Sequence, residues 1–461
     1  MAPRKAAAAP KKASRAKPAA AAAGNVVAAG DSMSVALDAG FTHRVVFARN
    51  AFGNGGGPLA DILREGCREN PRVLAVVDYN VARQTQGLPG GIAAAMEAAG
   101  ATPAGKPVLA AGGEQAKNDG GRTAWALANT MLSAGLSRGD CVLAIGGGAV
   151  LDAACFAAAA VRGGIATVRM PTTLLAQCAS GCSVSCGVDT PARKNAFSAR
   201  TSAIATVCDF SFLSSLTPEN FRNGIPEAVR TAALHDREFL EWIGENAGKL
   251  AVCDAAAAEE TVRRSVAAGM RGLAERGAAG SFCRFGGWAA DRLQETSRWR
   301  LWHGYALAMG VCIDTAYAVQ KRWLPEEDGD LIGTILHKTG GLYGLERFPQ
   351  LLDNAASLTE GLAEWGENLR GPLAVSYPGP LGEERVETDV DAALYAGIVK
   401  ELRETSAELA RRRREAAKAP APGPAPEAAP EEPPREEPAT QDAAGGEAPG
   451  AEDAGADAPE A

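Results

Sequence analysis

The sequence predicts an α/β protein in which a Rossmann-like, mostly parallel sheet domain is followed by an all-helical domain. From residue 43 to residue 210, short apolar runs that end in glycine or polar residues alternate with helical patterns. This alternation is typical of a parallel sheet covered by helices. After about residue 216 the strand pattern nearly disappears, and helical patterns follow one another. A chain of 461 residues has room for two or three domains.

The two ends of the chain differ in composition from the body. Residues 1–24 carry six basic residues and no acidic one, whereas residues 419–461 carry eleven acidic residues against Arg435 alone. Such segments bury too little apolar surface to offset the entropy lost on ordering, so we expect both tails to be disordered. The folded body then divides into a Rossmann-like sheet domain over 40–215 and a helical domain over 216–415.

Charge and composition exclude several classes of function. The formal net charge of −8 divides into +6 for the first tail, −10 for the last and −4 for the body, so only the N-terminal tail offers a basic surface for nucleic acid. No apolar run approaches the roughly 20 residues of a membrane span, and the N-terminus lacks the apolar core of a secretory signal. The ten cysteines are scattered through apolar segments, as reduced thiols are. We therefore expect a cytoplasmic protein.

The most informative stretch of the chain runs over residues 140–195. It opens with the apolar run CVLAIGGG, whose last residues are Gly146, Gly147 and Gly148. A helical pattern follows, with Asp152 in its first turns. A strand, a glycine turn and a helix N-terminus together present free backbone N–H groups to a pyrophosphate. The turn is neither G-x-G-x-x-G nor a P-loop, so a tight turn without a ligand remains an alternative at this point.

Further motifs in the same stretch narrow the interpretation. A second apolar run ends in PTTLLAQ, which contains Thr172 and Thr173, and the pair Lys194-Asn195 follows. Together with GGG-x-x-x-D and a Gly-Val pair, these motifs resemble the dehydroquinate synthase family of sugar-phosphate cyclases, and PTTLLAQ is the most specific of them. The resemblance covers roughly residues 40–415. It implies a parallel-sheet domain and a helical domain, with the active site in the cleft between them.

The resemblance also implies a reaction. Dehydroquinate synthases oxidise a substrate hydroxyl with tightly bound NAD, release phosphate, reduce the ketone again and close a carbocycle, while a divalent metal polarises the reacting hydroxyl. The substrate would be an anionic, sugar-phosphate-like small molecule. The residues that match the family's cofactor-binding positions are Asp78, Asn80, Glu114, Lys117, Gly146, Gly147, Gly148, Asp152, Thr172, Thr173 and Lys194.

The positions that bind the metal in the family are only partly retained. There, a Glu and two His hold zinc or cobalt, as in catalytic sites that keep an open position. Glu227 in PEAVR matches the first ligand, and His303 in HGY matches the second. Gly287 stands where the third ligand is expected. Asp291, one helical turn farther along, could supply an oxygen ligand instead.

Other positions that contact the substrate in the family also differ. Ala179 and Ser185 replace an Asp and a Lys. Arg230 replaces a Lys, which keeps the charge but not the shape, and Tyr305 replaces a Glu. Ordinary dehydroquinate synthesis is therefore expected to be absent or very weak. The candidates that remain for catalytic groups are Lys194, Asn195, Arg230 and Asp291.

Each retained residue also has a purely structural interpretation. Glu227 can be a solvated helix residue, His303 a satisfied core histidine, and His235 a surface histidine rather than a substitute ligand. Metal sites usually combine close cysteine pairs with distant partners. Cys178, Cys182 and Cys186 instead recur every four residues, as metal ligands on one helix face would, so a cysteine metal site is the less favoured alternative.

Three hypotheses about function remain. The first is a divergent, NAD-dependent sugar-phosphate cyclase, a lyase whose metal and substrate site is eroded or rebuilt. The second is an NAD-binding pseudoenzyme that acts as a partner or regulatory protein. The third is a metal-dependent alcohol dehydrogenase of the same fold, although those enzymes usually carry a Lys where this chain has Phe156. The substrate and the oligomeric state, including a homodimer, stay open.

Overall fold

The described part of the protein consists of two short strands and a long body. The computed structural model describes residues 26–29, 32–35, 42–180, 183–190, 193–201, 203–276, 285–369 and 373–418. The tails that we expect to be disordered lie outside this part, as does Cys182. Ahead of the body, β1 (Val26–Ala29) pairs antiparallel with β2 (Ser32–Val35).

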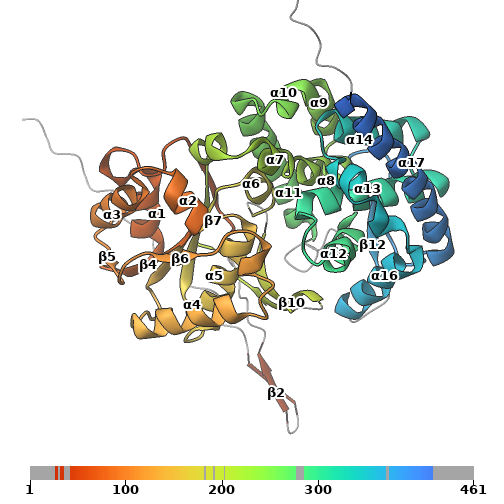
Figure 1. The fold of residues 1–461 in the computed structure, drawn as a ribbon. Coiled ribbons are helices and arrows are strands. Elements are labelled where there is room, and N and C mark those ends of the chain that lie inside the picture. Colours follow the sequence, from red (N-terminus) through yellow and green to blue (C-terminus); the bar gives the residue numbers. More distant parts are fainter. Residues whose placement is uncertain are drawn as a thin grey trace, which may run out of the picture. The chain divides into compact units, whose positions relative to one another are not determined.

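A seven-stranded parallel sheet forms the centre of the N-terminal half (Figure 1). Its strands are β3 (Val45–Ala48), β4 (Arg72–Asp78), β5 (Thr102–Pro103), β6 (Val108–Ala110), β7 (Cys141–Gly146), β8 (Ala166–Pro171) and β11 (Ala205–Asp209). Their order in space is β3, β11, β8, β7, β4, β5, with β6 beside β4. All neighbours run parallel. The fold class predicted from the alternating pattern is confirmed.

Helices cover both faces of this sheet. They include α1 (Gly57–Gly66), α3 (Leu88–Ala98), α4 (Arg122–Ser133) and α5 (Gly148–Ala160). Because successive strand residues point to opposite faces, β4 contributes to two separate cores. Val73 and Val77 pack with α1 and α3, whereas Leu74 and Val76 pack with α4 and α5. This two-sided burial explains why the strands read as continuous apolar runs.

A hairpin that the sequence pattern did not predict follows α6 (Leu174–Ser180). It consists of β9 (Ser185–Thr190) and β10 (Arg193–Arg200), which pair antiparallel with an irregularity in register. Cys178 lies in α6 and Cys186 in β9, so these two thiols do not share a helix. The alternative of a cysteine site on one helix face is therefore wrong.

Within the described ranges, the C-terminal half is helical apart from one short hairpin and packs around one hydrophobic core. Its helices are α7 (Pro218–Arg222), α8 (Ile225–His235), α9 (Arg237–Glu245), α10 (Ala247–Ala251), α11 (Ala255–Arg276), α12 (Gly287–Thr296), α13 (His303–Gln320), α14 (Glu326–Lys338), α15 (Tyr343–Arg347), α16 (Ala355–Leu369) and α17 (Ala392–Lys418). The hairpin consists of β12 (Val375–Pro378) and β13 (Glu384–Glu387), where the sequence over 372–388 has the pattern of a hairpin. No helix in the described ranges is long and apolar enough to span a membrane.

One predicted helix is in fact two. The pattern over 225–243 predicted a single helix, but α8 ends at His235 and α9 begins at Arg237. Asp236 between them is extended, with φ −163°, and its carboxylate accepts a hydrogen bond from the backbone N–H of Phe239 at 2.9 Å. An Asp in this position caps the N-terminus of a new helix, so the local cap interrupts the apolar periodicity.

Two close backbone approaches fix the start of α12 and of α13. A Cβ atom at Gly310 would lie 2.0 Å from the backbone oxygen of Gly286, and one at Gly304 would lie 1.6 Å from that of Asn223. Only glycine fits at such distances. The buried carboxylate of Asp314 also accepts a hydrogen bond from the N–H of Gly286 at 2.6 Å. The contacts of Gly286 hold α12 against α13, and the contact of Gly304 holds the start of α13 against Asn223; these two helices carry Asp291 and His303.

Candidate cofactor and active site

The carboxyl ends of the parallel strands bring the predicted cofactor residues to one edge of the sheet. Asp78 ends β4, Gly146 ends β7, and Thr172 directly follows β8. The N–H of Thr172 donates to the backbone oxygen of Gly146 at 3.0 Å. The N–H of Asn80 donates to the carboxylate of Asp78 at 2.8 Å, so Asp78 also caps α2 (Tyr79–Gln84). Ligands of open parallel sheets bind at this edge.

The glycine turn leaves space above the N-terminus of α5. A Cβ atom at Gly148 would find no atom within 4 Å, and one at Gly147 would meet only Cγ2 of Thr173, at 3.5 Å. Within the described residues, the hydroxyl of Thr172 and one carboxylate oxygen of Glu114 are buried without a hydrogen-bond partner. Buried polar groups normally have partners, and a helix N-terminus favours anions. These residues therefore fit a dinucleotide.

A buried ion pair lies beside the turn. Nζ of Lys117 is 2.6 Å from the carboxylate of Asp152, and the side chain of Lys117 is only 8% exposed. Burial alone would lower the pKa of Lys117, but Asp152, Asp189 and Glu114 raise it above its ordinary value. Burial alone would likewise raise the pKa of Glu114, but the Lys194 and Lys117 cations hold it below its usual range. This edge of the sheet therefore holds fixed charges of both signs.

Lys194 connects this edge to the helical half. Its ammonium donates to Oε1 of Gln294 and lies 3.0 Å from Nδ1 of His303. Nζ is 3.7 Å from Oε1 of Glu114 and 3.9 Å from Oδ1 of Asp291. The side chain of Lys194 is 6% exposed. Residues predicted for cofactor, metal and catalysis thus meet in one group of side chains, which we call the Lys194 cluster: Lys194, Gln294, His303, Glu114 and Asp291.

The backbone that carries Lys194 is held on both sides. The N–H of Lys194 donates to the carboxylate of Glu295 at 3.0 Å, and the N–H of Asn195 donates to that of Asp189 at 2.7 Å. Asn195 has φ 51°, a left-handed conformation that Asn tolerates better than most residues. Burial raises the pKa of Asp189 to about 6 and that of Glu295 to about 7. Asn195 therefore shapes the hairpin.

The donors at the predicted metal site do not fit a divalent ion. Glu227 is buried and accepts a hydrogen bond from Arg230 on the same helix. His303 lies against the ammonium of Lys194, and Gly287, at the first position of α12, contributes no side chain. No group of three or more His, Cys, Asp or Glu side chains in the described ranges could hold a metal ion. Each of the two matched ligands already has a cationic partner.

Three further positions at which the sequence differs from the family are Tyr305, Ala179 and Ser185. The hydroxyl of Tyr305 donates to the backbone oxygen of Glu219 at 2.8 Å, and its ring packs against Tyr343 with centroids 4.8 Å apart. Ala179 lies near the end of α6, and Ser185 begins β9. An aromatic contact therefore replaces the acid that the family carries at the position of Tyr305.

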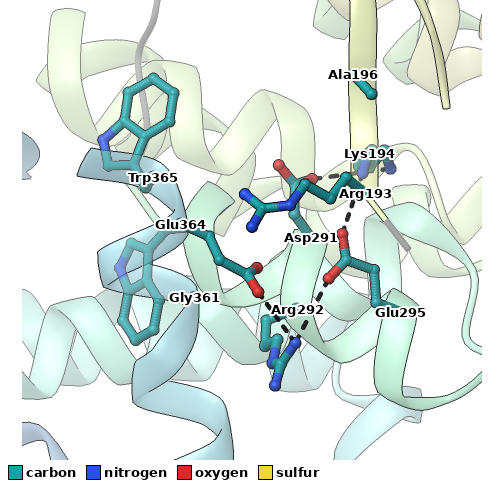
Figure 2. Close-up of a pocket in the computed structure, with 10 residues that line it drawn as sticks. Arg193, Lys194, Ala196, Asp291, Arg292, Glu295, Gly361, Glu364 and Trp365 are labelled. Carbon is teal, nitrogen blue, oxygen red and sulfur yellow. Dashed lines mark hydrogen bonds and ion pairs between the residues drawn. The ribbon is translucent and has the colours of Figure 1, made fainter. Parts of the chain in front are cut away.

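A small cavity of about 40 Å³ adjoins the Lys194 cluster (Figure 2). Its charged lining residues are Arg193, Lys194, Asp291, Arg292, Glu295 and Glu364. Arg193 pairs with Glu367 at 2.8 Å, and Arg292 pairs with Glu364 at 3.3 Å. The cations at this cavity are therefore already compensated by carboxylates, so an anionic ligand has to exchange with them.

Sequence reasoning missed Gln294, which is fully buried and contacts three members of the Lys194 cluster. One signal was available, because Gln294 lies three residues after Asp291 and residues at that spacing share a helix face. Glu295 and Arg292 of the same helix, which line the cavity, were also missed. The three polar residues Arg292, Gln294 and Glu295, which lie close together on a helix with buried apolar neighbours, could have indicated a polar site there.

Fold and site together define an α/β protein whose N-terminal half is built on a parallel sheet and whose C-terminal half is helical. The family models described as the 3-dehydroquinate synthase N-terminal and C-terminal regions match residues 107–223 and 224–356. A 3-dehydroquinate synthase of Brucella anthropi is 31% identical over 304 residues, which cover 65% of this chain and 80% of the relative. The chain belongs to the 3-dehydroquinate synthase family.

Solved structures share the fold. A 2-epi-5-epi-valiolone synthase of Streptomyces hygroscopicus, with NAD⁺ and Zn²⁺ bound, has a TM-score of 0.68 and 22% identity, covering 81% of this chain and 99% of that chain. A 2-deoxy-scyllo-inosose synthase with carbaglucose-6-phosphate, NAD⁺ and Co²⁺ has a TM-score of 0.62 and 20% identity, with coverages of 82% and 99%. An iron-containing alcohol dehydrogenase of Thermotoga maritima has a TM-score of 0.53 and 16% identity, covering 79% and 98%.

Proposed function

We propose that the protein binds NAD and is a divergent sugar-phosphate cyclase that does not carry out ordinary dehydroquinate synthesis. The observation that carries this proposal is the contrast between two parts of one site. The edge with the glycine turn and the Lys117–Asp152 pair keeps the residues and the space that a dinucleotide needs. The predicted metal ligands Glu227 and His303 are each engaged by a cation of the protein itself.

The residues that would hold NAD are those of the sheet edge. Bound there, the cofactor supplies a hydride acceptor for a substrate hydroxyl. The N-terminus of α5 and the open space at Gly148 would take the pyrophosphate. Lys117 stays charged beside Asp152, and this ion pair would hold α5 in place next to the bound cofactor. The ammonium of Lys194 is a fixed positive charge that can stabilise negative charge developing on a substrate oxygen.

The substrate class that we propose is an anionic, sugar-phosphate-like molecule. Two kinds of support exist: the family itself, and a structural neighbour solved with carbaglucose-6-phosphate. Arg193 and Arg292 are the cations at the cavity that such a phosphate would reach by exchange with Glu367 and Glu364. Because the residues do not fit a metal, no step of the proposed chemistry passes through one. Free thiols among the described cysteines agree with the cytoplasmic location that we propose.

A second candidate is an NAD-binding pseudoenzyme that acts as a partner or regulatory protein. Saturation of Glu227 and His303 by internal cations favours it, because no open ligand position remains. The alcohol dehydrogenase hypothesis gains less support. Phe156, at the position where those enzymes usually carry a Lys, packs edge-on against Trp125 of α4 at a centroid distance of 6.4 Å.

Phosphate release separates these candidates. The full chain is assayed with NAD and zinc or cobalt, using the seven-carbon keto-acid phosphate of dehydroquinate synthases and a panel of other sugar phosphates. We expect turnover on the keto-acid phosphate far below the median enzyme value of about 10 per second, and NAD-dependent phosphate release from another sugar phosphate. Release from no substrate would favour the pseudoenzyme. Turnover near the median value on the keto-acid phosphate would contradict the proposal.

A further inference from the structure

We propose that the inner end of the small cavity, formed by Asp291, Glu295 and Glu364, binds a protonated amino group, so that the substrate is an amino sugar phosphate. The inference deepens the proposed function and rests on it for the sugar-phosphate class of the ligand. The cavity of about 40 Å³ is far smaller than a pocket for a whole small molecule, which has roughly 300 Å³ or more. It therefore suits one polar substituent of a ligand rather than a complete sugar ring.

The described residues around this inner end carry more carboxyl groups than cations (Figure 2). Asp291 and Glu295 belong to α12, and Glu364 belongs to α16. Nη1 of Arg292 is 3.3 Å from Glu364 and 3.8 Å from Glu295. The other cation, the ammonium of Lys194, is 3.9 Å from Asp291 and also serves the rest of its cluster. The inner end therefore keeps a surplus of acidic groups.

Glu295 carries an oxygen that the described residues leave without a hydrogen bond. Its side chain is only 10% exposed, and Oε1 accepts a hydrogen bond from the N–H of Lys194 at 3.0 Å. Oε2 is buried and has no hydrogen-bond partner there. Burial, with the nearby carboxylates of Glu364 and Asp291, raises the pKa of Glu295 to about 7. Because buried polar groups normally have partners, a donor inside the cavity would complete this site.

Arg292 is directed toward α16 and not toward Glu295. Its Nε donates to the backbone oxygen of Ser357 at 2.9 Å, and its Nη2 donates to Oγ of the same residue at 3.2 Å. It also donates to Glu360 and Glu364. A rotation of the guanidinium toward Oε2 of Glu295 would break several of these hydrogen bonds. The charge that Glu295 lacks would therefore come from a ligand.

An ammonium group fits this place better than the other small ligands. A phosphate would meet Arg193 at the more exposed side of the cavity, where it exchanges with Glu367. The described ranges hold no group of three side chains that could bind a metal ion. A hydroxyl group can donate one hydrogen bond to Glu295, but it brings no charge. An ammonium can donate three, and charge-assisted hydrogen bonds are roughly twice as strong as neutral ones.

The test compares amino and hydroxyl ligands on the full chain with NAD present. Calorimetry at about pH 7 measures the binding of glucose 6-phosphate and of analogues with an amino group in place of the hydroxyl at C2, C3 or C4. We expect at least one amino analogue to bind at least about 10-fold more tightly than glucose 6-phosphate. Glu295→Gln keeps an oxygen for the N–H of Lys194 but loses the charge, so it should remove this preference. Glu65→Gln, which removes an exposed carboxylate paired with Arg44, should keep it.

The pH dependence separates recognition by Glu295 from a merely structural effect. Below its pKa of about 7 Glu295 takes up a proton, whereas the amino group of the ligand stays charged. The preference for the amino analogue should therefore shrink in the wild type as the pH falls to about 5.5. Asp291 and Glu364 on one side and Lys194 and Arg292 on the other are the charged groups that face Glu295. In Glu295→Gln, no preference should exist at either pH.

Each outcome decides the inference. Equal affinities of the wild type for glucose 6-phosphate and for all three amino analogues would overturn it and leave the proposed function intact. A preference that persists in folded Glu295→Gln would also overturn it. If a melting curve shows that Glu295→Gln does not fold, Glu364→Gln takes its place and should weaken the preference in the same way. If no sugar phosphate binds at all, the proposed function and this inference are both contradicted.

Discussion

Nζ of Lys194 lies 3.0 Å from Nδ1 of His303, although the two residues are 109 positions apart in the chain. The contact joins β10 of the hairpin to the first residue of α13 in the helical half. It brings a residue predicted to bind cofactor against a residue predicted to bind metal. The contact therefore depends on how the hairpin packs against the helical half.

Breaking the buried ion pair beside the glycine turn should be costly. Lys117→Met leaves the carboxylate of Asp152 without its cation, whereas Glu114 still has Lys194 nearby, and removal of one partner of a buried pair typically costs about 3–5 kcal/mol. The free energy of unfolding in urea measures the change. The matched control is Arg411→Ala, which breaks a mostly exposed pair with Glu408 and should cost no more than about 1 kcal/mol. Equal effects for the two variants would contradict a structural role for Lys117.

The close approach of α12 and α13 predicts a large difference between two similar substitutions. Gly310→Ala would place Cβ 2.0 Å from the backbone oxygen of Gly286, so we expect a loss of at least about 3 kcal/mol or failure to fold. Gly333→Ala in α14 meets nothing within 4 Å and should stabilise the protein by about 0.5–1 kcal/mol. Thermal and urea unfolding measure both. A mild effect of Gly310→Ala would mean that the helices do not pack this closely.

Asp314 predicts a pH dependence of stability. Burial raises its pKa from 3.8 to about 7, although hydrogen bonds from Tyr395, Gly286 and Trp288 oppose the shift. The folded protein therefore keeps a proton that the unfolded chain releases above pH 3.8, so the free energy of unfolding should fall as the pH rises towards about 7. The full effect is on the order of 4 kcal/mol.

The variant Asp314→Asn isolates this contribution. Glu295 and Asp189 also have raised pKa values, of about 7 and about 6, and add slopes of the same sign. In the variant, the free energy of unfolding should still fall with rising pH, because Glu295 and Asp189 remain. Between about pH 4 and pH 7 its slope should be smaller than that of the wild type by the contribution of one bound proton. Urea unfolding at several pH values gives both curves. Parallel curves for wild type and variant would show that Asp314 is ionised in the folded state.

Local patterns predicted the strands of the sheet and the glycine turn at one of its edges. Strand, glycine turn and helix follow one another within a few residues, so β7, the turn at Gly147 and α5 could be located from spacing alone. The hairpin β9–β10 could not, because a run rich in Cys, Ser and Gly has no clear alternation of apolar and polar residues. The break at Asp236 was missed because apolar periodicity continues across it.

The candidate site was predictable in its parts but not in its contacts. The resemblance indicated Glu227, His303 and Lys194 one position at a time. Pairing of Lys194 with His303 depends on how the hairpin meets α13, a long-range relation that no local spacing encodes. Gln294, which contacts both, is indicated only by its spacing three residues after Asp291, because a buried glutamine in a helix has the same spacing as a core residue.

Binding of NAD by the full chain, measured calorimetrically with wild type and Gly147→Val, tests the central claim most directly. Gly147 has φ −69°, and a Cβ there meets only Thr173 at 3.5 Å, so the variant should fold normally while its side chain obstructs the approach of a pyrophosphate. Gly397→Val, in open space on α17, is the control. We expect one equivalent of NAD for wild type and control, and none for Gly147→Val. Absence of binding by the folded wild type at millimolar NAD, or unchanged binding by Gly147→Val, would contradict the account.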